Sequence, residues 1–132
     1  MKKHFRLVTR VCACVFACAS SAAASTISVG AGGNLQAAIN GAQPGDTIAL
    51  QPGATFTGNF TLPFKGGDAL ITIRTAGDAG LPGDGGRISP ANAGSLAKIR
   101  QGSGAPAIQT APGAHNWRLA LVEIRARATA TS

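Results

Sequence analysis

One stretch, from Leu35 to Gly53, restricts the fold more than any other part of the sequence. It reads Leu-Gln-Ala-Ala-Ile-Asn-Gly-Ala-Gln, then Pro-Gly-Asp-Thr-Ile-Ala-Leu-Gln, and ends on a second Pro-Gly pair. The spacing of its apolar residues changes from about four to two, which predicts a short amphipathic helix followed by a strand. Each Pro-Gly pair suits a type II turn, in which glycine accepts a positive φ. A helix that leads into a strand this early can cap a stack of strands.

The predicted helix, from Leu35 to Ala42, is too short to be stable alone. Asn34 is a favourable N-cap, and the apolar residues Leu35, Ala38, Ile39 and Ala42 recur along one stripe. Because nucleation is costly and the length is marginal, a helix of two turns does not persist in water. We therefore expect Leu35 and Ile39 to pack on an apolar surface.

The segment 1–24 has the composition of a secretory signal peptide. Four basic residues precede an apolar run at 11–19, and the segment ends in Ala22-Ala23-Ala24. Cleavage is predicted before Ser25, which leaves residues 25–132 as one exported domain, periplasmic or extracellular. The apolar run is shorter than the roughly 20 residues that span a bilayer, so no stable membrane insertion is expected after cleavage.

All three cysteines lie in this leader, at Cys12, Cys14 and Cys18. The mature chain would therefore have neither a disulfide nor a thiolate metal site. Lipidation of Cys18 is an alternative, although Phe16 occupies a position where a small residue is usual.

Removal of the leader also lowers the net charge. Four of the twelve Lys and Arg residues lie in it and none of the five acidic residues do, which leaves eight basic and five acidic residues, a formal charge of +3. The remaining charges are dispersed, so we expect no nucleic-acid partner. The 18 glycines and 7 prolines all follow the leader and separate short apolar runs, as turn residues do.

Alternation of apolar and polar residues predicts short strands in the mature chain. Residues 26–29 and 47–50 alternate, and the run 56–64 keeps a period of two throughout, which predicts one continuous strand. Three further strands each contain an Ile-Arg pair, at Ile73-Arg74, Ile99-Arg100 and Ile124-Arg125, and the intervals between successive pairs are nearly equal. A period of this length is typical of a solenoid. We expect the three isoleucines to form an inward column and the three arginines an outward column.

Several of these residues resemble the N-terminal part of bacterial secreted right-handed parallel β-helix proteins of the pectate lyase-like class. The matching residues are Gly-Asn-Leu-Gln-Ala-Ala-Ile at 33–39, Pro-Gly-Asp-Thr-Ile at 44–48, Pro-Gly at 52–53, and Phe56, Gly58 and Phe60. The similarity continues through 71–74 and 111–118 and covers most of the mature chain. It implies a mainly β fold, a right-handed parallel β-helix of about three coils with a short N-terminal capping helix.

The resemblance also implies where activity would reside. In this class the catalytic acids and bases lie on middle coils, and the parent protein would be a polysaccharide lyase or glycoside hydrolase. Residues 125–132 lose the apolar alternation and supply no C-terminal cap. We therefore expect a truncated product that is inactive on its own.

The few carboxylates favour structural roles over catalysis. Asp46 follows Pro-Gly and is interpreted as a turn residue. Asp78 and Asp84 flank a loop in which a weak Ca²⁺ site is an alternative to solvated turn residues. Glu123 is expected to form a surface pair with Arg125. We expect no catalytic residue, cofactor or metal in this chain, although Ca²⁺ binding is compatible with the full-length class.

The candidate binding residues are Arg74, Arg100, Arg125 and Trp117. Stacked strands lie about 4.8 Å apart, so a column of arginines would repel unless solvated, paired or bound to a polyanion such as an acidic polysaccharide. Trp117 could stack on a sugar ring, or it could belong to the core. His115 is interpreted as part of a turn, because no second metal ligand or nucleophile accompanies it.

Three functions remain open from the sequence. The chain could begin a polysaccharide-degrading enzyme, or a non-enzymatic surface or adhesive β-helix that binds glycan or a protein partner. A β-sandwich carbohydrate-binding module is a third alternative, which the helix and the regular interval between the Ile-Arg pairs disfavour. Further coils with clustered acidic residues downstream would support the enzyme.

Overall fold

The computed structural model describes residues 23–77, 80–83 and 85–128, and this part of the chain is mainly β. It contains nine strands, one short α-helix and one 3₁₀ turn. The elements are β1 (Thr26–Val29), α1 (Leu35–Gly41), β2 (Thr47–Leu50), β3 (Thr55–Gly58), β4 (Phe60–Leu62), β5 (Ile71–Thr75), η1 (Pro90–Asn92), β6 (Ala97–Gln101), β7 (Ile108–Thr110), β8 (Trp117–Ala120) and β9 (Val122–Arg125).

The strands form three sheets, and every pairing between them is parallel. One sheet has the order β1-β2-β5-β8, the second β3-β6-β9 and the third β4-β7; we call them sheets A, B and C. The chain visits the sheets in the same order on successive passes, first through β2, β3 and β4, then through β5, β6 and β7. Each later pass therefore lays its strands beside those of the pass before.

The interior is one apolar cluster built from residues that occupy matching positions on successive strands. In sheet A, Ile48 pairs in register with Ile73, and in sheet B, Phe56 pairs with Ile99. All four side chains are buried and belong to the same cluster. Alternation along each strand directs these residues inward and their polar neighbours outward.

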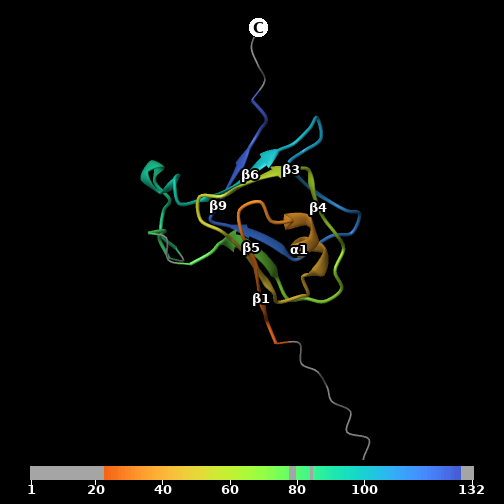
Figure 1. The fold of residues 1–132 in the computed structure, drawn as a ribbon. Helices are drawn as coiled ribbons and strands as arrows, with labels where there is room; N and C mark the ends of the chain where they lie inside the picture. Colours follow the sequence, from red (N-terminus) through yellow and green to blue (C-terminus); the bar gives the residue numbers. More distant parts are fainter. Residues whose placement is uncertain (1–22, 78–79, 84, 129–132) are drawn as a thin grey trace, which may run out of the picture.

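Helix α1 begins as the sequence predicts, because the Asn34 side chain accepts a hydrogen bond from the backbone N–H of Ala37. Leu35 and Ile39 are each only 1% exposed, so their predicted burial is confirmed. Figure 1 looks onto α1, which lies over the space enclosed by the strands. The expectation of a helix at the N-terminal end is wrong, since β1 precedes it and pairs with β2.

The continuous strand predicted over 56–64 is also wrong. The chain turns at Asn59, so β3 belongs to sheet B and β4 to sheet C. The Asn59 side chain holds this corner by donating to the carbonyl oxygens of Ala105 and Pro106 on the next pass. Phe56, Phe60 and Leu62 are buried on both sides of the corner, whereas Phe64 is 57% exposed.

The single columns of three isoleucines and three arginines do not form. Ile73 and Arg74 lie in sheet A, whereas Ile99 and Arg100 lie in sheet B, where they pair with Ile124 and Arg125. The interval between the first two Ile-Arg pairs runs within one pass, from β5 across a long connection to β6. Ile124, on the last strand of sheet B, is 52% exposed.

Sharp turns join the strands, and the glycines of both Pro-Gly pairs adopt the predicted positive φ, 94° at Gly45 and 74° at Gly53. Leu121 also has a positive φ, 52°, at the corner between β8 and β9. Thr75, which is fully buried, fixes this corner: its hydroxyl donates to the Leu121 carbonyl oxygen and accepts from the N–H of Ala97, 2.9 Å away.

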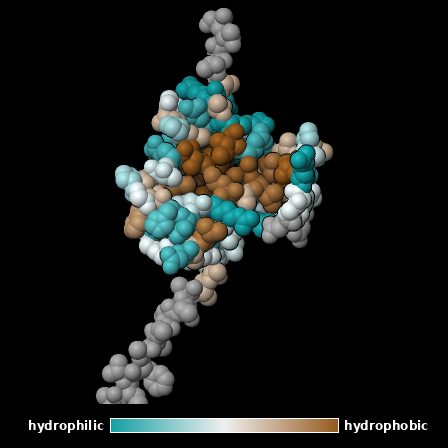
Figure 2. Space-filling model, turned by 180° about the vertical axis from the view of Figure 1, so that it is seen from behind, coloured by the Kyte–Doolittle hydropathy of each residue, from teal (hydrophilic) through white to brown (hydrophobic). Residues whose placement is uncertain are grey.

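The end of the molecule opposite α1 is not covered by another element of the described chain. Figure 2, which views this side, shows a broad apolar area at its centre. The last strands of sheets A and B carry the exposed residues Leu119 and Ile124. Among the described residues, no helix has the length and apolar character needed to cross a membrane.

Candidate functional site

Three basic side chains come together on the outer face of sheet B. Lys98 and Arg100 alternate on β6 with the buried residues Ala97 and Ile99, so both point away from the core. Arg125 on β9 pairs in register with Arg100, which places the two arginines on neighbouring strands. We call Lys98, Arg100 and Arg125 the basic strip.

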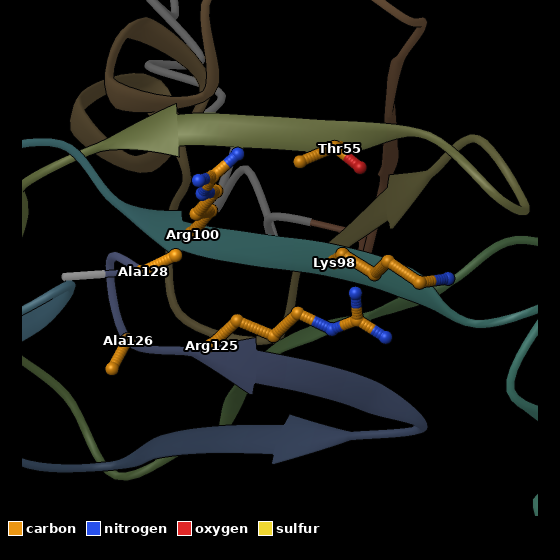
Figure 3. Close-up of a pocket in the computed structure, with 6 residues that line it drawn as sticks. All are labelled: Thr55, Lys98, Arg100, Arg125, Ala126 and Ala128. Atoms are coloured by element: carbon orange, nitrogen blue, oxygen red, sulfur yellow. The ribbon is translucent and has the colours of Figure 1, made fainter. Parts of the chain in front are cut away.

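The basic strip borders a shallow hollow of about 300 Å³, whose other lining residues are Thr55, Ala126 and Ala128. In Figure 3 the Arg125 side chain runs toward Lys98, whereas the Arg100 side chain turns toward β3. The two guanidinium groups therefore point to different parts of the hollow, which separates their charges.

Glu123 neutralises part of the basic strip. It pairs in register with Lys98, whose Nζ lies 3.9 Å from one carboxylate oxygen, and the other oxygen accepts a hydrogen bond from Nε of Arg125. The expected pair of Glu123 and Arg125 is thus confirmed. Lys98 also donates to the carbonyl oxygens of Ala93 and Leu96, at 2.7 and 3.0 Å. Arg100 forms no ion pair with any described residue, so its charge is the most available.

Arg74 lies outside the basic strip, on the outer face of sheet A. Its Nε donates to the Thr75 carbonyl oxygen, 3.3 Å away. A second hollow of about 300 Å³ is lined by Arg74, by Arg118 and by part of the connection after β5. Arg118 pairs in register with Thr72, which lies two residues before Arg74 on β5.

Sequence reasoning missed Lys98, which alternates with apolar residues on a predicted strand, and Arg118, which lies on β8, a strand that was not predicted. The outward position of Lys98 could therefore have been inferred from alternation, but its membership in a particular sheet could not.

Trp117 lies against the core and not on an open face. It is partly buried beside the apolar cluster, and its indole N–H donates to the Pro63 carbonyl oxygen, 3.0 Å away. These contacts favour the core role that the sequence left open, because a ring held in this way presents little surface to a sugar.

The other candidate groups have separate structural contacts. His115 places Nδ1 2.8 Å from the Gly113 carbonyl oxygen, and its ring lies 5.4 Å from that of Phe64. Asp78 and Asp84, considered for Ca²⁺, lie outside the described residues. Within the described part of the chain, no three His, Cys, Asp or Glu residues cluster as metal ligands would.

Asp46 is buried, unlike a simple surface turn residue. Its carboxylate accepts hydrogen bonds from the backbone N–H of Gln43 at 2.8 Å and of Ser25 at 2.9 Å. These two bonds hold the pKa of the Asp46 carboxyl below its usual value, and burial opposes them only in part. The carboxylate therefore links the turn after α1 to the start of β1.

Comparison with known proteins found no match to a family model, to a curated protein or to a solved structure. The fold alone therefore defines the class: the residues that the structure describes are mainly β, with parallel sheets and one short α-helix.

Proposed function

We propose that this chain is the N-terminal capping region and first coils of an exported right-handed parallel β-helix protein, related to pectate lyase-like enzymes that degrade polysaccharides. Support comes from the parallel pairing in all three sheets and from the buried stripe of α1, as a coil closed by a helix requires. The leader-like composition of residues 1–24 supports export to the periplasm or the cell exterior.

We further propose that the basic strip binds acidic polysaccharide. The observation that carries this proposal is the register of Arg100 with Arg125, which places two exposed arginines on adjacent strands. Only one carboxylate of the described residues, Glu123, forms ion pairs with the basic strip. Like charges at this spacing repel, and a bound carboxylate would relieve the repulsion. Guanidinium groups suit this role because they form paired hydrogen bonds with carboxylates.

Binding without catalysis fits this chain better than catalysis does. Glycoside hydrolysis usually requires two carboxyl groups that face each other across the scissile bond. Of the described carboxylates, Asp46 is bound by backbone N–H groups in the turn before β2, Glu123 on β9 is bound by basic side chains, and Asp68 is exposed on the connection after β4. A non-enzymatic surface or adhesive β-helix, which binds glycan or a protein partner, is therefore the second candidate function.

Calorimetric titration with polygalacturonate tests the polyanion proposal. We expect binding at about 0.02 M salt that weakens strongly at about 0.5 M, because salt screens exposed charges. Replacing Arg100 and Arg125 together by glutamine should raise the dissociation constant at low salt roughly three- to tenfold, as expected for the loss of two exposed ion pairs.

Arg87→Gln provides the matched control, since Arg87 is exposed and borders neither hollow. It removes one positive charge and should leave the dissociation constant within about twofold. Uncharged dextran should not bind. Absence of polygalacturonate binding at low salt, or an equal effect of Arg87→Gln, would remove the proposal.

A further inference from the structure

The carboxylate of Asp46 and the backbone nitrogen of Ser25 form a close, partly buried contact. Asp46 is 6% exposed, and its Oδ1 lies 2.9 Å from the Ser25 nitrogen. Ser25 is held in place by its own carbonyl oxygen, which accepts from the N–H of Thr47 at 2.8 Å, one step before the pairing of β1 with β2. The position of the Ser25 nitrogen relative to the Asp46 carboxylate is therefore fixed by the pairing of the two chain segments.

No side-chain cation neutralises this carboxylate within the described chain. Both ion pairs of the described residues involve Glu123. The connection 63–70 packs against the turn before Asp46, since Gly45 donates to the Leu70 carbonyl oxygen. Its charged residues are Lys65, which donates to the Asn40 carbonyl oxygen, and the exposed Asp68. The neighbouring strands β5 and β8 contribute Arg74 and Arg118 on the outer face of sheet A.

We propose that cleavage of the peptide bond between Ala24 and Ser25 completes this site, because the new α-ammonium group of Ser25 forms an ion pair with Asp46. A peptidase adds one water molecule across the bond, so that Ala24 gains a carboxylate and the Ser25 nitrogen becomes an ammonium group. This inference rests on the proposed export and on removal of the leader before Ser25.

The geometry requires little movement of the chain. The Ser25 nitrogen already lies at 2.9 Å, a distance that suits a hydrogen bond between an ammonium and a carboxylate. Cleavage changes the charge of the donor and leaves its position, so a hydrogen bond from a neutral amide to the carboxylate becomes an ion pair between two charged groups. Cleavage one residue away would place the ammonium group elsewhere and leave the Ser25 donor an uncharged amide.

The pair also predicts a dependence of stability on alkaline pH. An adjacent carboxylate raises the pKa of an ammonium group in the folded state above its unfolded value of about 7.7–8.0. The added stability is therefore fully present below that range and is lost as the pH rises through the folded pKa.

The test uses the same protein before and after cleavage. In the full chain, residues 21–24 are replaced by the recognition sequence of a site-specific protease that cuts directly before Ser25. At pH 6 the cut protein should melt about 1–8 °C higher than the uncut protein, the shift expected for one such pair in a domain of this size. At pH 10.5 the two melting temperatures should converge.

Two controls separate the ion pair from other effects of cutting. Acetylation of the new α-amino group after cleavage should return the melting temperature to that of the uncut protein. Asp46→Asn should make cut and uncut proteins equal at pH 6. If this variant does not fold, NMR titration of the Ser25 α-amino group in the cut protein tests the ion pair instead. A pKa of this group at or below about 8.0, the ordinary value, would overturn the inference.

An equal melting temperature of cut and uncut protein at pH 6 would also overturn it. Mass spectrometry of the naturally exported protein tests the assumed cleavage site separately. A mature chain that begins elsewhere than Ser25 would contradict leader removal at this bond. The protease experiment would still report on the ion pair.

Discussion

Two polar side chains of the described residues are buried, Asp46 and Thr75, and each joins backbone segments that are distant in the sequence. Asp46 connects the turn before β2 with Ser25, and Thr75 connects the end of β5 with Ala97 and Leu121. Buried polar groups are costly unless they are hydrogen-bonded, so both positions depend strongly on their partners.

Replacement of Asp46 by asparagine should destabilise the uncut chain by about 1–3 kcal/mol at pH 7, because Ser25 and Gln43 donate to different carboxylate oxygens and the amide puts an NH₂ group in place of one of them. The lowered pKa of Asp46 means that its stabilising effect is present above the unfolded value near 3.8 and is lost as the pH falls through the folded pKa. Urea unfolding at pH 7 and pH 3 should therefore show a smaller difference between the two proteins at pH 3.

Asp68→Asn is the control for this comparison, since Asp68 is exposed and the same charge is removed. Its effect at pH 7 should stay within about 0.5 kcal/mol. Equal losses for the two variants would show that net charge, and not the hydrogen bonds of Asp46, sets the stability.

At the residue scale, the sequence predicts conformation better than it predicts partners. Asn34 as N-cap and positive φ at Gly45 and Gly53 follow from local chemistry, and each is confirmed. The burial of Asp46 could not be predicted in this way, because it depends on which strand lies beside β2. The burial of Thr75 depends on tertiary packing for the same reason.

At the scale of elements, the Gln36 side chain attaches α1 to sheet C by forming the pair of backbone hydrogen bonds that a neighbouring strand would form. The Gln36 amide donates to the Thr61 carbonyl oxygen and accepts from the Thr61 N–H, each at 2.9 Å. Both groups of Thr61 lie on the edge of β4 that no strand occupies in the described chain. The helix thus satisfies the sheet edge as well as covering the core.

Gln36→Glu should weaken this attachment by about 1–3 kcal/mol at pH 7, because a carboxylate accepts from the Thr61 N–H but cannot donate to its carbonyl oxygen. The deficit should shrink as the pH falls and the new carboxyl group is protonated. Ala37→Glu adds the same charge at the next, exposed helical position and should change the free energy of unfolding by less than about 0.5 kcal/mol. Thermal unfolding of both variants across pH 3–7 measures the difference.

Most elements could be predicted from the sequence, but their arrangement could not. The periods of α1, β1, β2, β5, β6 and β9 are visible in the residue pattern, and all of them form. The corner at Asn59 leaves the alternation of buried residues intact across two sheets, so periodicity could not reveal it. The connection between β5 and β6 is long, so the interval between the first two Ile-Arg pairs resembled a repeat between passes, although both pairs lie within one pass.

In the candidate site, the misread repeat had led us to group arginines that in fact lie in two different sheets. Arg100 and Arg125 lie together as expected, because β6 and β9 are adjacent in one sheet. Arg74 lies in sheet A, and Lys98 takes its place beside them. Predicting this set would require the strand order, which depends on tertiary packing.

For the whole molecule, a single apolar cluster extends from α1 to the strands of the later passes. Leu35 of α1 and Ile99 of β6 both belong to it, although they are distant in the sequence. A core without a break between its parts favours one cooperative unfolding transition.

Leu35→Ala should lower the free energy of unfolding by about 2–5 kcal/mol, since it leaves a cavity in a fully buried position. Far-UV circular dichroism reports on all the sheets, whereas fluorescence reports on Trp117, the single tryptophan, far along the chain in β8. Both signals should shift together to lower urea. Ala37→Leu at an exposed position is the control, and two separated transitions would contradict a common core.

The uncovered face at the end opposite α1 bears on how proteins of this architecture can vary in size. The pass β5-β6-β7 meets the pass before it in all three sheets, and β8 and β9 continue sheets A and B, so the last strands offer the same kind of edge as the earlier ones. In such an arrangement, a segment of sequence that encodes one more turn can be appended without altering any earlier contact. The same α1 and first strands could therefore serve chains of many different lengths.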